Sequence, residues 1–200
     1  MGFGDRWALK NGMNMKYEPI ISEQYYHIYN CGNNREDIFI EEQNYPYFLE
    51  QLKKHIIPVA HILSYCLLKN HFHLLINTKN VEDKKISQAF SNFFNAYAKA
   101  INKKYGRKGS LFQRKFQRKR IDSEDYLRKL AVYINLNPVI HGFCEDYKDY
   151  KHSSYNALVS DRPTSLERAF VIDLFDDREN FKYSLDTRKY DIDDDDYYLE

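Results

Sequence analysis

The chain has 200 residues, of which 43% are hydrophobic and 30% are charged, which is enough apolar material for one sizeable folded core. No apolar run approaches the roughly 20 residues of a transmembrane helix, and the first residues lack the continuous apolar segment of a secretory signal. Thirty Lys and Arg residues against twenty-nine Asp and Glu residues give a formal net charge of +1, which by itself argues against a polyanion partner.

This near-zero charge is the sum of two segments of opposite sign. Residues 151–200 contain seven basic and thirteen acidic residues, a net of −6, so residues 1–150 carry +7. Residues 86–121 contain ten basic residues and no acidic one. A solvated surface is one explanation, but so many cations without a carboxylate favour a polyanion partner. The basic residues that we expect to contact nucleic acid are Lys103, Lys104, Arg107, Lys108, Arg114, Lys115, Arg118, Lys119 and Arg120.

The three cysteines are widely separated, at Cys31, Cys66 and Cys144. No C-x-x-C pair exists, which disfavours a zinc ribbon or a thioredoxin-like motif. We therefore expect thiols rather than disulfides, as in a reducing cytoplasm.

Three strands and one helix are predicted in the first part of the chain. Residues 25–30 are rich in Tyr and Ile and precede a turn signal, which is typical of a strand. Residues 41–56 have apolar residues at helical spacing, and Pro46 fits a first helical turn. Residues 61–68 and 71–77 are two apolar strands joined by two residues, which predicts a hairpin.

Two further helices and one strand are predicted in the next part of the chain. Residues 83–104 are predicted to form a long amphipathic helix, and residues 111–121 a strand that is basic on one face. A further helix should begin at Asp122 or Ser123 and end near Leu136, because Pro138 disfavours helical backbone in the residue before it. The order β-α-β-β-α-β-α predicts a ferredoxin-like α+β fold, an antiparallel sheet with helices on one face.

The chain is expected to divide into three parts. Residues 1–22 are weakly patterned and are interpreted as a flexible lead, and residues 23–160 as the folded domain. Residues 161–200 end in a run of acidic residues and are expected to be an acidic, partly disordered tail.

His71 and His73 are two residues apart in a predicted strand, so both side chains point to one face and Phe72 to the other. Imidazoles about 6.5–7 Å apart along a strand can converge on one divalent ion. Two half-exposed strand histidines without a ligand would give the same pattern, so the pair alone leaves both interpretations open. The other histidines show no paired spacing and are interpreted as structural or surface residues: His27, His55, His61, His141 and His152.

Tyr133 and Asn137 lie one turn apart on the last predicted helix, so a phenol and a carboxamide share a helix face. A tyrosine can attack phosphorus covalently when its hydroxyl lies beside a metal-bound phosphate, and a carboxamide oxygen can be a third metal ligand. A packed tyrosine followed by a helix-ending asparagine explains the same residues. Tyr97 is a reserve nucleophile, but it belongs to an aromatic stripe with Phe90, Phe93 and Phe94 that is typical of core packing.

Five blocks of the sequence, taken together and in order, resemble the IS200-like and REP-associated tyrosine transposases, which are single-strand DNA nucleases of the HUH, single-tyrosine type. The blocks cover roughly residues 25–158 and are YYHIYNCGNNREDIF, YCLLKNHFHLLI, GSLFQRKFQ, DYLRKLAVYINLNPVIHG and KDYKHSSYNAL. The resemblance implies that His71 and His73 are the metal-binding pair and that Tyr133 is the nucleophile. It also implies that Asn137 assists metal binding.

The same resemblance implies an activity. The chain would be a metal-dependent single-strand DNA endonuclease and strand transferase, a transposase that uses Mg²⁺ or Mn²⁺ and forms a 5′-phosphotyrosine intermediate at Tyr133. Residues 23–160 would be the ferredoxin-like catalytic domain, and Lys69, where many relatives have proline, is a departure that concerns only a turn. Expected partners are single-stranded or hairpin DNA and a second copy of the chain, without a membrane. The expected location is the bacterial cytoplasm, in association with the nucleoid.

Two alternatives to this activity remain at the level of sequence. One is a domesticated, non-catalytic protein that binds hairpin DNA or RNA. The other is a metal hydrolase that uses a bound hydroxide and forms no covalent link to the protein.

Overall fold

A four-stranded antiparallel sheet forms the centre of the protein, whose computed structural model describes residues 18–113 and 115–188. The order of the strands is β2-β3-β1-β4. Helix α2 connects β1 to β2, and helix α3 connects β3 to β4, which confirms the predicted ferredoxin-like arrangement. The bounds are β1 (Tyr25–Cys31), α2 (Asn44–His55), β2 (Ala60–Leu68), β3 (His71–Thr78), α3 (Asp83–Lys104) and β4 (Gln117–Ile121).

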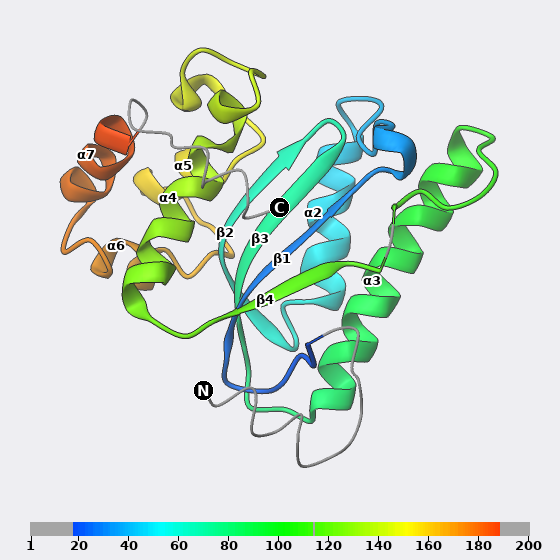
Figure 1. Cartoon of the computed structure of the whole chain (residues 1–200), viewed down its shortest axis with the longest axis horizontal. Helices are drawn as coiled ribbons and strands as arrows, with labels where there is room; N and C mark the ends of the chain where they lie inside the picture. The colour runs from blue at the N-terminus through cyan, green and yellow to red at the C-terminus, as the bar shows by residue number, and fades with distance from the viewer. Residues whose placement is uncertain (1–17, 114, 189–200) are drawn as a thin grey trace.

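Helices cover both faces of this sheet (Figure 1). Helices α2 and α3 pack on one face, as the ferredoxin-like prediction requires. The other face, which the prediction left without helices, is covered by α4 and the elements after it. These elements are α4 (Glu124–Ile140), α5 (Tyr155–Val159), α6 (Arg168–Asp173) and α7 (Arg178–Arg188), and two short 3-10 turns are η1 (Asn33–Arg35) and η2 (Tyr147–Asp149).

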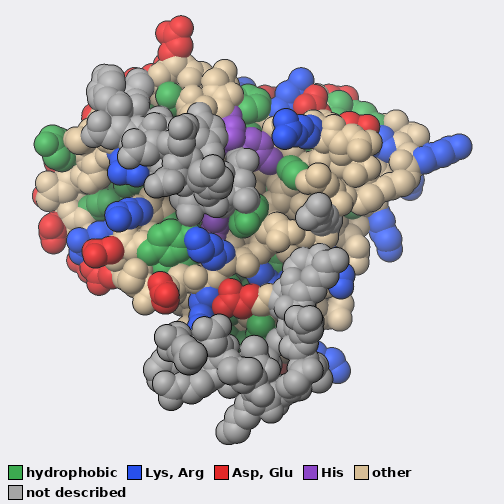
Figure 2. Space-filling model, in the orientation of Figure 1, with side chains coloured by type: hydrophobic (Ala, Val, Ile, Leu, Met, Phe, Trp, Pro, Cys, Tyr) green, Lys and Arg blue, Asp and Glu red, His purple; other side chains and the backbone are tan. Residues whose placement is uncertain are grey.

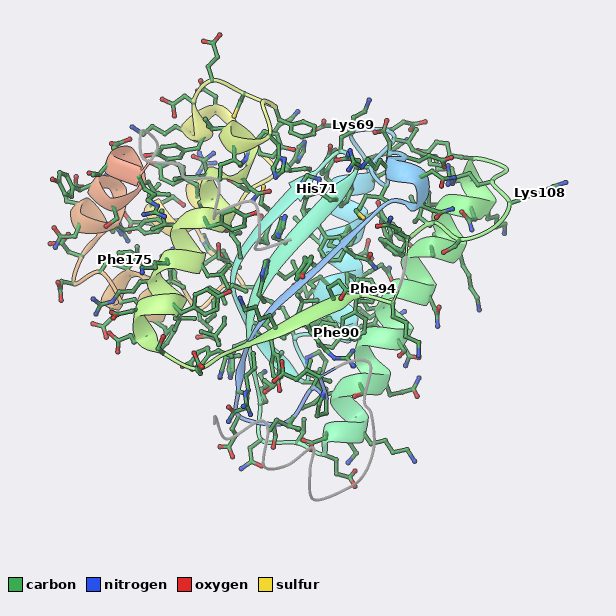
Figure 3. All side chains as sticks on the ribbon, in the orientation of Figure 1. Lys69, His71, Phe90, Phe94, Lys108 and Phe175 are labelled. Atoms are coloured by element: carbon green, nitrogen blue, oxygen red, sulfur yellow. The ribbon has the colours of Figure 1, made fainter. Side chains whose placement is uncertain are left out.

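Alternation along β3 divides the buried side chains between two cores. Phe72 and Leu74 belong to the core beneath α2 and α3, whereas Leu75 belongs to the core beneath α4. Figure 3 shows Phe90 and Phe94 of α3 on one side of the sheet and Phe175 in the α4 layer on the other. The aromatic stripe of α3 is therefore core packing, as predicted. His71 and His73 lie four and two residues before Leu75 on β3, so their side chains point to the same face of the sheet and toward α4.

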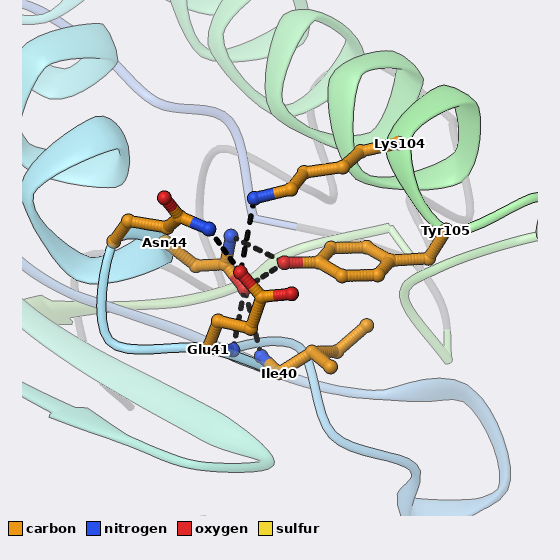
Figure 4. Close-up of polar contacts among 6 residues, drawn as sticks. Ile40, Glu41, Asn44, Lys104 and Tyr105 are labelled. Carbon is orange, nitrogen blue, oxygen red and sulfur yellow. Dashed lines mark hydrogen bonds and ion pairs between the residues drawn. The ribbon is translucent and has the colours of Figure 1, made fainter.

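Helix α2 begins at Asn44, three residues after the predicted start, because the Asn44 side chain closes the turn before it. Its Oδ1 accepts hydrogen bonds from the backbone N–H groups of Ile40 and Glu41, both 2.9 Å long (Figure 4). The same carboxamide donates to the Tyr105 hydroxyl at 3.1 Å. The first turn of α2 is thereby tied to the end of α3.

The strand predicted over residues 111–121 is regular only from Gln117. Leu111 and Phe112 are adjacent, and both are buried in the core beneath α3. A regular strand points neighbouring side chains to opposite faces, so this double burial breaks the strand pattern. One isolated β-bridge, between Phe112 and Gly32, connects this segment to the residue that follows β1.

Helix α4 continues through Pro138 to Ile140, beyond the predicted end near Leu136. The proline lies in the last turn, where carbonyls of the helix are satisfied by the chain that follows. The N–H groups of His141 and Phe143 donate to the carbonyls of Asn137 and Pro138 at 3.0 and 2.8 Å. Gly142 makes this closure possible at φ +68°, in the left-handed region that favours glycine.

The segment predicted to be an acidic tail from residue 161 is folded up to residue 188. Val171 of α6 and Phe181 and Leu185 of α7 are buried in the core beneath α4. The weak amphipathic pattern of these short helices explains why the sequence did not indicate them. Residues 189–200, and residues 1–17 of the predicted lead, lie outside the described residues, whereas Ile20 is buried in the core beneath α3.

Two further findings concern membrane-spanning helices and disulfides. Within the described ranges, no helix is long and apolar enough to cross a membrane. All three cysteines are among the described residues, and none of them forms a disulfide, in agreement with the prediction.

Candidate active site

The predicted site residues of β3 and α4 meet between the sheet and the helix. The Tyr133 ring lies edge-on to the His73 ring, with centroids 5.7 Å apart. The His71 and His73 rings are 5.3 Å apart. Asn137 follows Tyr133 by one turn and lies on the same side of α4, where the helix packs on β2 and β3. Tyr133, His73 and Asn137 are 4%, 1% and 0% exposed, so all three are shielded from bulk water.

A hydrogen bond orients the His71 ring. Its Nδ1 lies 2.8 Å from Oδ1 of Asn70, and because that oxygen only accepts, Nδ1 carries the proton and Nε2 the lone pair. This is the arrangement usual for a histidine that binds a metal through Nε2. His71 is the first residue of β3, and Figure 3 shows it close to the turn that contains Lys69.

Unused polar atoms in the site are consistent with a bound cation. Nε2 of His73 and both polar atoms of the Asn137 side chain are buried and make no hydrogen bond within residues 18–113 and 115–188. Burying a polar group in this way costs about 1–3 kcal/mol, so such atoms in a native protein call for a ligand or another function.

The donors that this site offers to a cation are few. No group of three or more His, Cys, Asp or Glu side chains in the described part of the chain could hold a metal ion. A divalent cation here would have the imidazoles of His71 and His73 and the Asn137 carboxamide oxygen as its protein donors. They would leave further coordination positions to water and phosphate oxygen, as Mg²⁺ and Mn²⁺ require.

Two histidines without paired spacing in the sequence, predicted to be structural or surface residues, lie against this site. His27 of β1 is fully buried, and its Nε2 lies 2.9 Å from Nδ1 of His73. His141, which caps α4, places its ring 4.7 Å from the His71 ring. His27 occupies a position of β1 whose side chain points to the face of the sheet that carries the site, and His141 lies one helical turn after Asn137. Both positions can be read from the sequence. Only the contacts between separate elements show that these two side chains reach the same site.

The reserve nucleophile Tyr97 lies on the other side of the sheet. It is fully buried beneath α3, and its hydroxyl donates to the Ile38 carbonyl at 2.7 Å. Burial raises the pKa of the Tyr97 phenol, with neighbouring tyrosines adding to the effect. Tyr97 therefore packs in the core away from the histidines, whereas Tyr133 and Tyr29 both lie against the His73 ring, Tyr133 edge-on at 5.7 Å and Tyr29 stacked at 5.9 Å.

The basic residues of segment 86–121 do not form one uncompensated surface. Three of them pair with carboxylates from residues 18–41, which the linear sequence places far away. The pairs are Lys104 with Glu41 (3.1 Å), Arg107 with Glu36 (2.6 Å) and Arg120 with Glu18 (3.5 Å). Arg114 lies outside the described residues. The prediction that the positive charges of this segment lack compensating carboxylates is therefore wrong for these three residues. Exposed ion pairs of this kind contribute little to the stability of the fold.

Strand β4 distributes its cations over both faces of the sheet. Lys119 is the direct neighbour of His27 in the β1–β4 pairing, and its ammonium lies 4.8 Å from the centre of the Tyr126 ring of α4. Arg118 alternates to the other face, where it lies 5.0 Å from the Phe116 ring. Figure 2 shows histidine side chains near the centre of one molecular face, with Lys and Arg side chains to either side.

A groove of about 610 Å³ lies between α3 and residues 109–118 of the basic segment. Its lining combines the cations Lys115 and Arg118, the aromatic ring of Phe116 and the amides Asn95 and Asn102. Lys103 and Lys108 are exposed farther along, and Lys108 projects well away from His71 (Figure 3). Of the predicted nucleic-acid residues, Lys119 thus lies on the face of the candidate site and Lys115 and Arg118 line this groove. The other described ones lie in ion pairs or on the surface farther along the segment.

Comparison with known proteins supports one family. A family model described as "Transposase IS200 like" matches residues 20–137. A protein of Haemophilus influenzae whose name describes it as a REP-associated tyrosine transposase is 29% identical over 99 residues, which are 46% of this chain and 56% of that protein. The chain thus spans little more than half the length of this curated relative.

A solved structure has the same fold. It is the structure of a REP-associated tyrosine transposase bound to a REP hairpin, with a TM-score of 0.59, 20% sequence identity and coverage of 76% of this chain and 89% of that one. The family model covers more than half of the chain and ends on Asn137, so it includes His71, His73 and Tyr133. The chain therefore belongs to the IS200-like transposase family.

Proposed function

We propose that this protein is a single-strand DNA endonuclease and strand transferase that cleaves DNA through Tyr133. The observation that supports this most strongly is the position of Tyr133, whose ring lies against His73 in a buried site that also contains His71. A hydroxyl nucleophile beside an imidazole pair is suited to attack on a phosphodiester. Hairpin DNA is the proposed substrate class, since the fold is shared with a transposase that was solved with a hairpin.

The proposed reaction conserves phosphodiester bonds. The Tyr133 oxygen forms a bond to phosphorus, the bond from phosphorus to the 3′ oxygen breaks, the tyrosine proton leaves and the 3′ oxygen gains a proton. The product is a 5′-phosphotyrosine and a free 3′-hydroxyl. Attack by another 3′-hydroxyl reverses the step and joins strands, so no external energy source is needed.

The remaining site residues prepare this step. His71, His73 and Asn137 would hold Mg²⁺ or Mn²⁺, which when bound supplies positive charge at the scissile phosphate. The Asn70 side chain fixes the His71 ring with its Nε2 lone pair available. Burial of Tyr133 and His73 keeps bulk water away from the phosphotyrosine and so protects it from hydrolysis.

Trapping the covalent intermediate is the test of this proposal. The full chain is incubated with Mn²⁺ and a panel of labelled DNA hairpins with single-stranded flanks, and protein-linked label is measured after denaturation. The expected result is a labelled protein whose modified peptide contains Tyr133. Cleavage without any protein-linked label would support a metal hydrolase instead, and binding without cleavage would support a non-catalytic hairpin-binding protein.

Lys119 is expected to contact the DNA backbone at the active-site face. Lys119→Ala should weaken hairpin binding for every sequence alike and lower the slope of log affinity against log salt by about one unit, because one phosphate contact is lost. Fluorescence anisotropy between low and moderate salt measures this. Lys99→Ala is the matched control, since Lys99 is an exposed residue of α3 in the layer on the other side of the sheet. An equal loss in both variants would rule out a specific contact by Lys119.

A further inference from the structure

The contact between His27 and His73 joins two imidazoles inside the protein. Nε2 of His27 and Nδ1 of His73 are 2.9 Å apart, and the two rings stack with centroids 5.1 Å apart at an angle of 21°. The residues are 0% and 1% exposed. They come from adjacent strands, β1 and β3, whose pairing holds their backbones rigidly.

The contact between the two rings holds one proton. Nε2 of His27 and Nδ1 of His73 are at hydrogen-bond distance, and a hydrogen bond between two ring nitrogens has one donor and one acceptor. A single proton therefore lies between the two rings.

That proton has two positions with different consequences for the site. If it sits on Nδ1 of His73, then His73 donates to His27 and its own Nε2 carries a lone pair. If it sits on Nε2 of His27, then His27 donates and His73 must carry its proton on Nε2. Only the first arrangement allows His73 to bind a cation through Nε2, the buried atom that makes no hydrogen bond among the described residues.

We propose that His27 is a positioning residue of the metal site, which accepts the Nδ1–H of His73 and thereby keeps the Nε2 lone pair of His73 available to the cation. His27 does for His73 what the Asn70 carboxamide does for His71. The acceptor at His27 is uncharged, so it orients His73 without adding a negative charge to the site. This inference rests on the proposed function, because it requires that His71 and His73 bind a divalent cation.

Metal affinity of the full chain, measured without DNA, tests the role of His27. Mn²⁺ binding is followed by electron paramagnetic resonance of the unbound ion, with circular dichroism as a check on folding. His27→Leu removes the acceptor and should weaken Mn²⁺ binding about 10–100-fold, the usual effect of losing the partner of a metal-binding histidine. His27→Gln can present an amide oxygen near the position of Nε2 and should bind Mn²⁺ much more tightly than His27→Leu.

A matched control separates this effect from adventitious binding by imidazoles. His61 lies on β2, is half-exposed and contacts Glu167, so His61→Leu should leave the affinity unchanged. Wild-type affinity in His27→Leu, or equal losses in His27→Leu and His27→Gln, would overturn the positioning role while leaving the metal site intact. Absence of Mn²⁺ binding by the wild-type chain would overturn the metal site and with it this inference.

The position of the proton is a second, independent measurement. Long-range ¹H–¹⁵N correlation spectra distinguish a protonated ring nitrogen from one with a lone pair. In the wild-type protein saturated with Mg²⁺, His73 should be protonated at Nδ1. A proton on Nε2 of His73 under these conditions would contradict the proposal whatever the affinities are.

Discussion

Tyr133→Phe should abolish both DNA cleavage and the covalent protein–DNA adduct while leaving hairpin binding close to that of the wild type. The substitution removes the hydroxyl and keeps the ring, which is 4% exposed and packs edge-on to His73 and His27. No charge is lost, so contacts with the DNA backbone remain. The adduct is measured on denaturing gels and binding by fluorescence anisotropy.

Tyr97→Phe is the matched control for this variant. Tyr97 is also buried, but it lies in the core beneath α3, on the opposite face of the sheet. Its substitution should cost about 1 kcal/mol of stability through the lost hydrogen bond to Ile38 and should leave the adduct in place. An adduct that persisted in Tyr133→Phe and vanished in Tyr97→Phe would show that the nucleophile has been assigned to the wrong tyrosine.

The second large effect is expected from the histidine pair. His71→Ala and His73→Ala should each reduce metal-dependent cleavage by roughly 100-fold or more, the loss typical when one group that stabilises transition-state charge is removed. Cleavage rates are measured over a series of Mn²⁺ concentrations, so that weaker metal binding is distinguished from a slower chemical step.

His55→Ala is the control for the histidine pair, because His55 lies at the end of α2, on the opposite face of the sheet from the active site. Its cleavage rate should match that of the wild type. Unchanged rates in His71→Ala and His73→Ala would exclude these residues from any role in metal binding and would require another set of ligands.

Local patterns in the sequence were sufficient to predict much of this site. Alternation in a strand places His71 and His73 on one face, and helical spacing places Tyr133 and Asn137 on another. Both rules depend only on the geometry of a single element. The structure confirms that each pair shares a face and adds that the two faces are turned toward each other.

Relations between distant segments were not accessible in the same way. The carboxylates that pair with Lys104, Arg107 and Arg120 come from residues 18–41, so counting charges within a segment could not find them. Helix α4 passes Pro138 because the chain after it closes the last turn. The short helices α6 and α7 are held by burial against α4 rather than by a strong amphipathic pattern.

The sequence by itself determined the order of the elements, the ferredoxin-like topology and the residues of the histidine pair and the tyrosine helix, because each of these follows from spacing along one strand or helix. The net charge of +1 was also correctly separated into a basic and an acidic part. Only the tertiary structure decided which cations are compensated, which face each one occupies and that His27 contacts His73. These features arise when strands pair and layers pack, and they therefore depend on contacts between residues far apart in the chain.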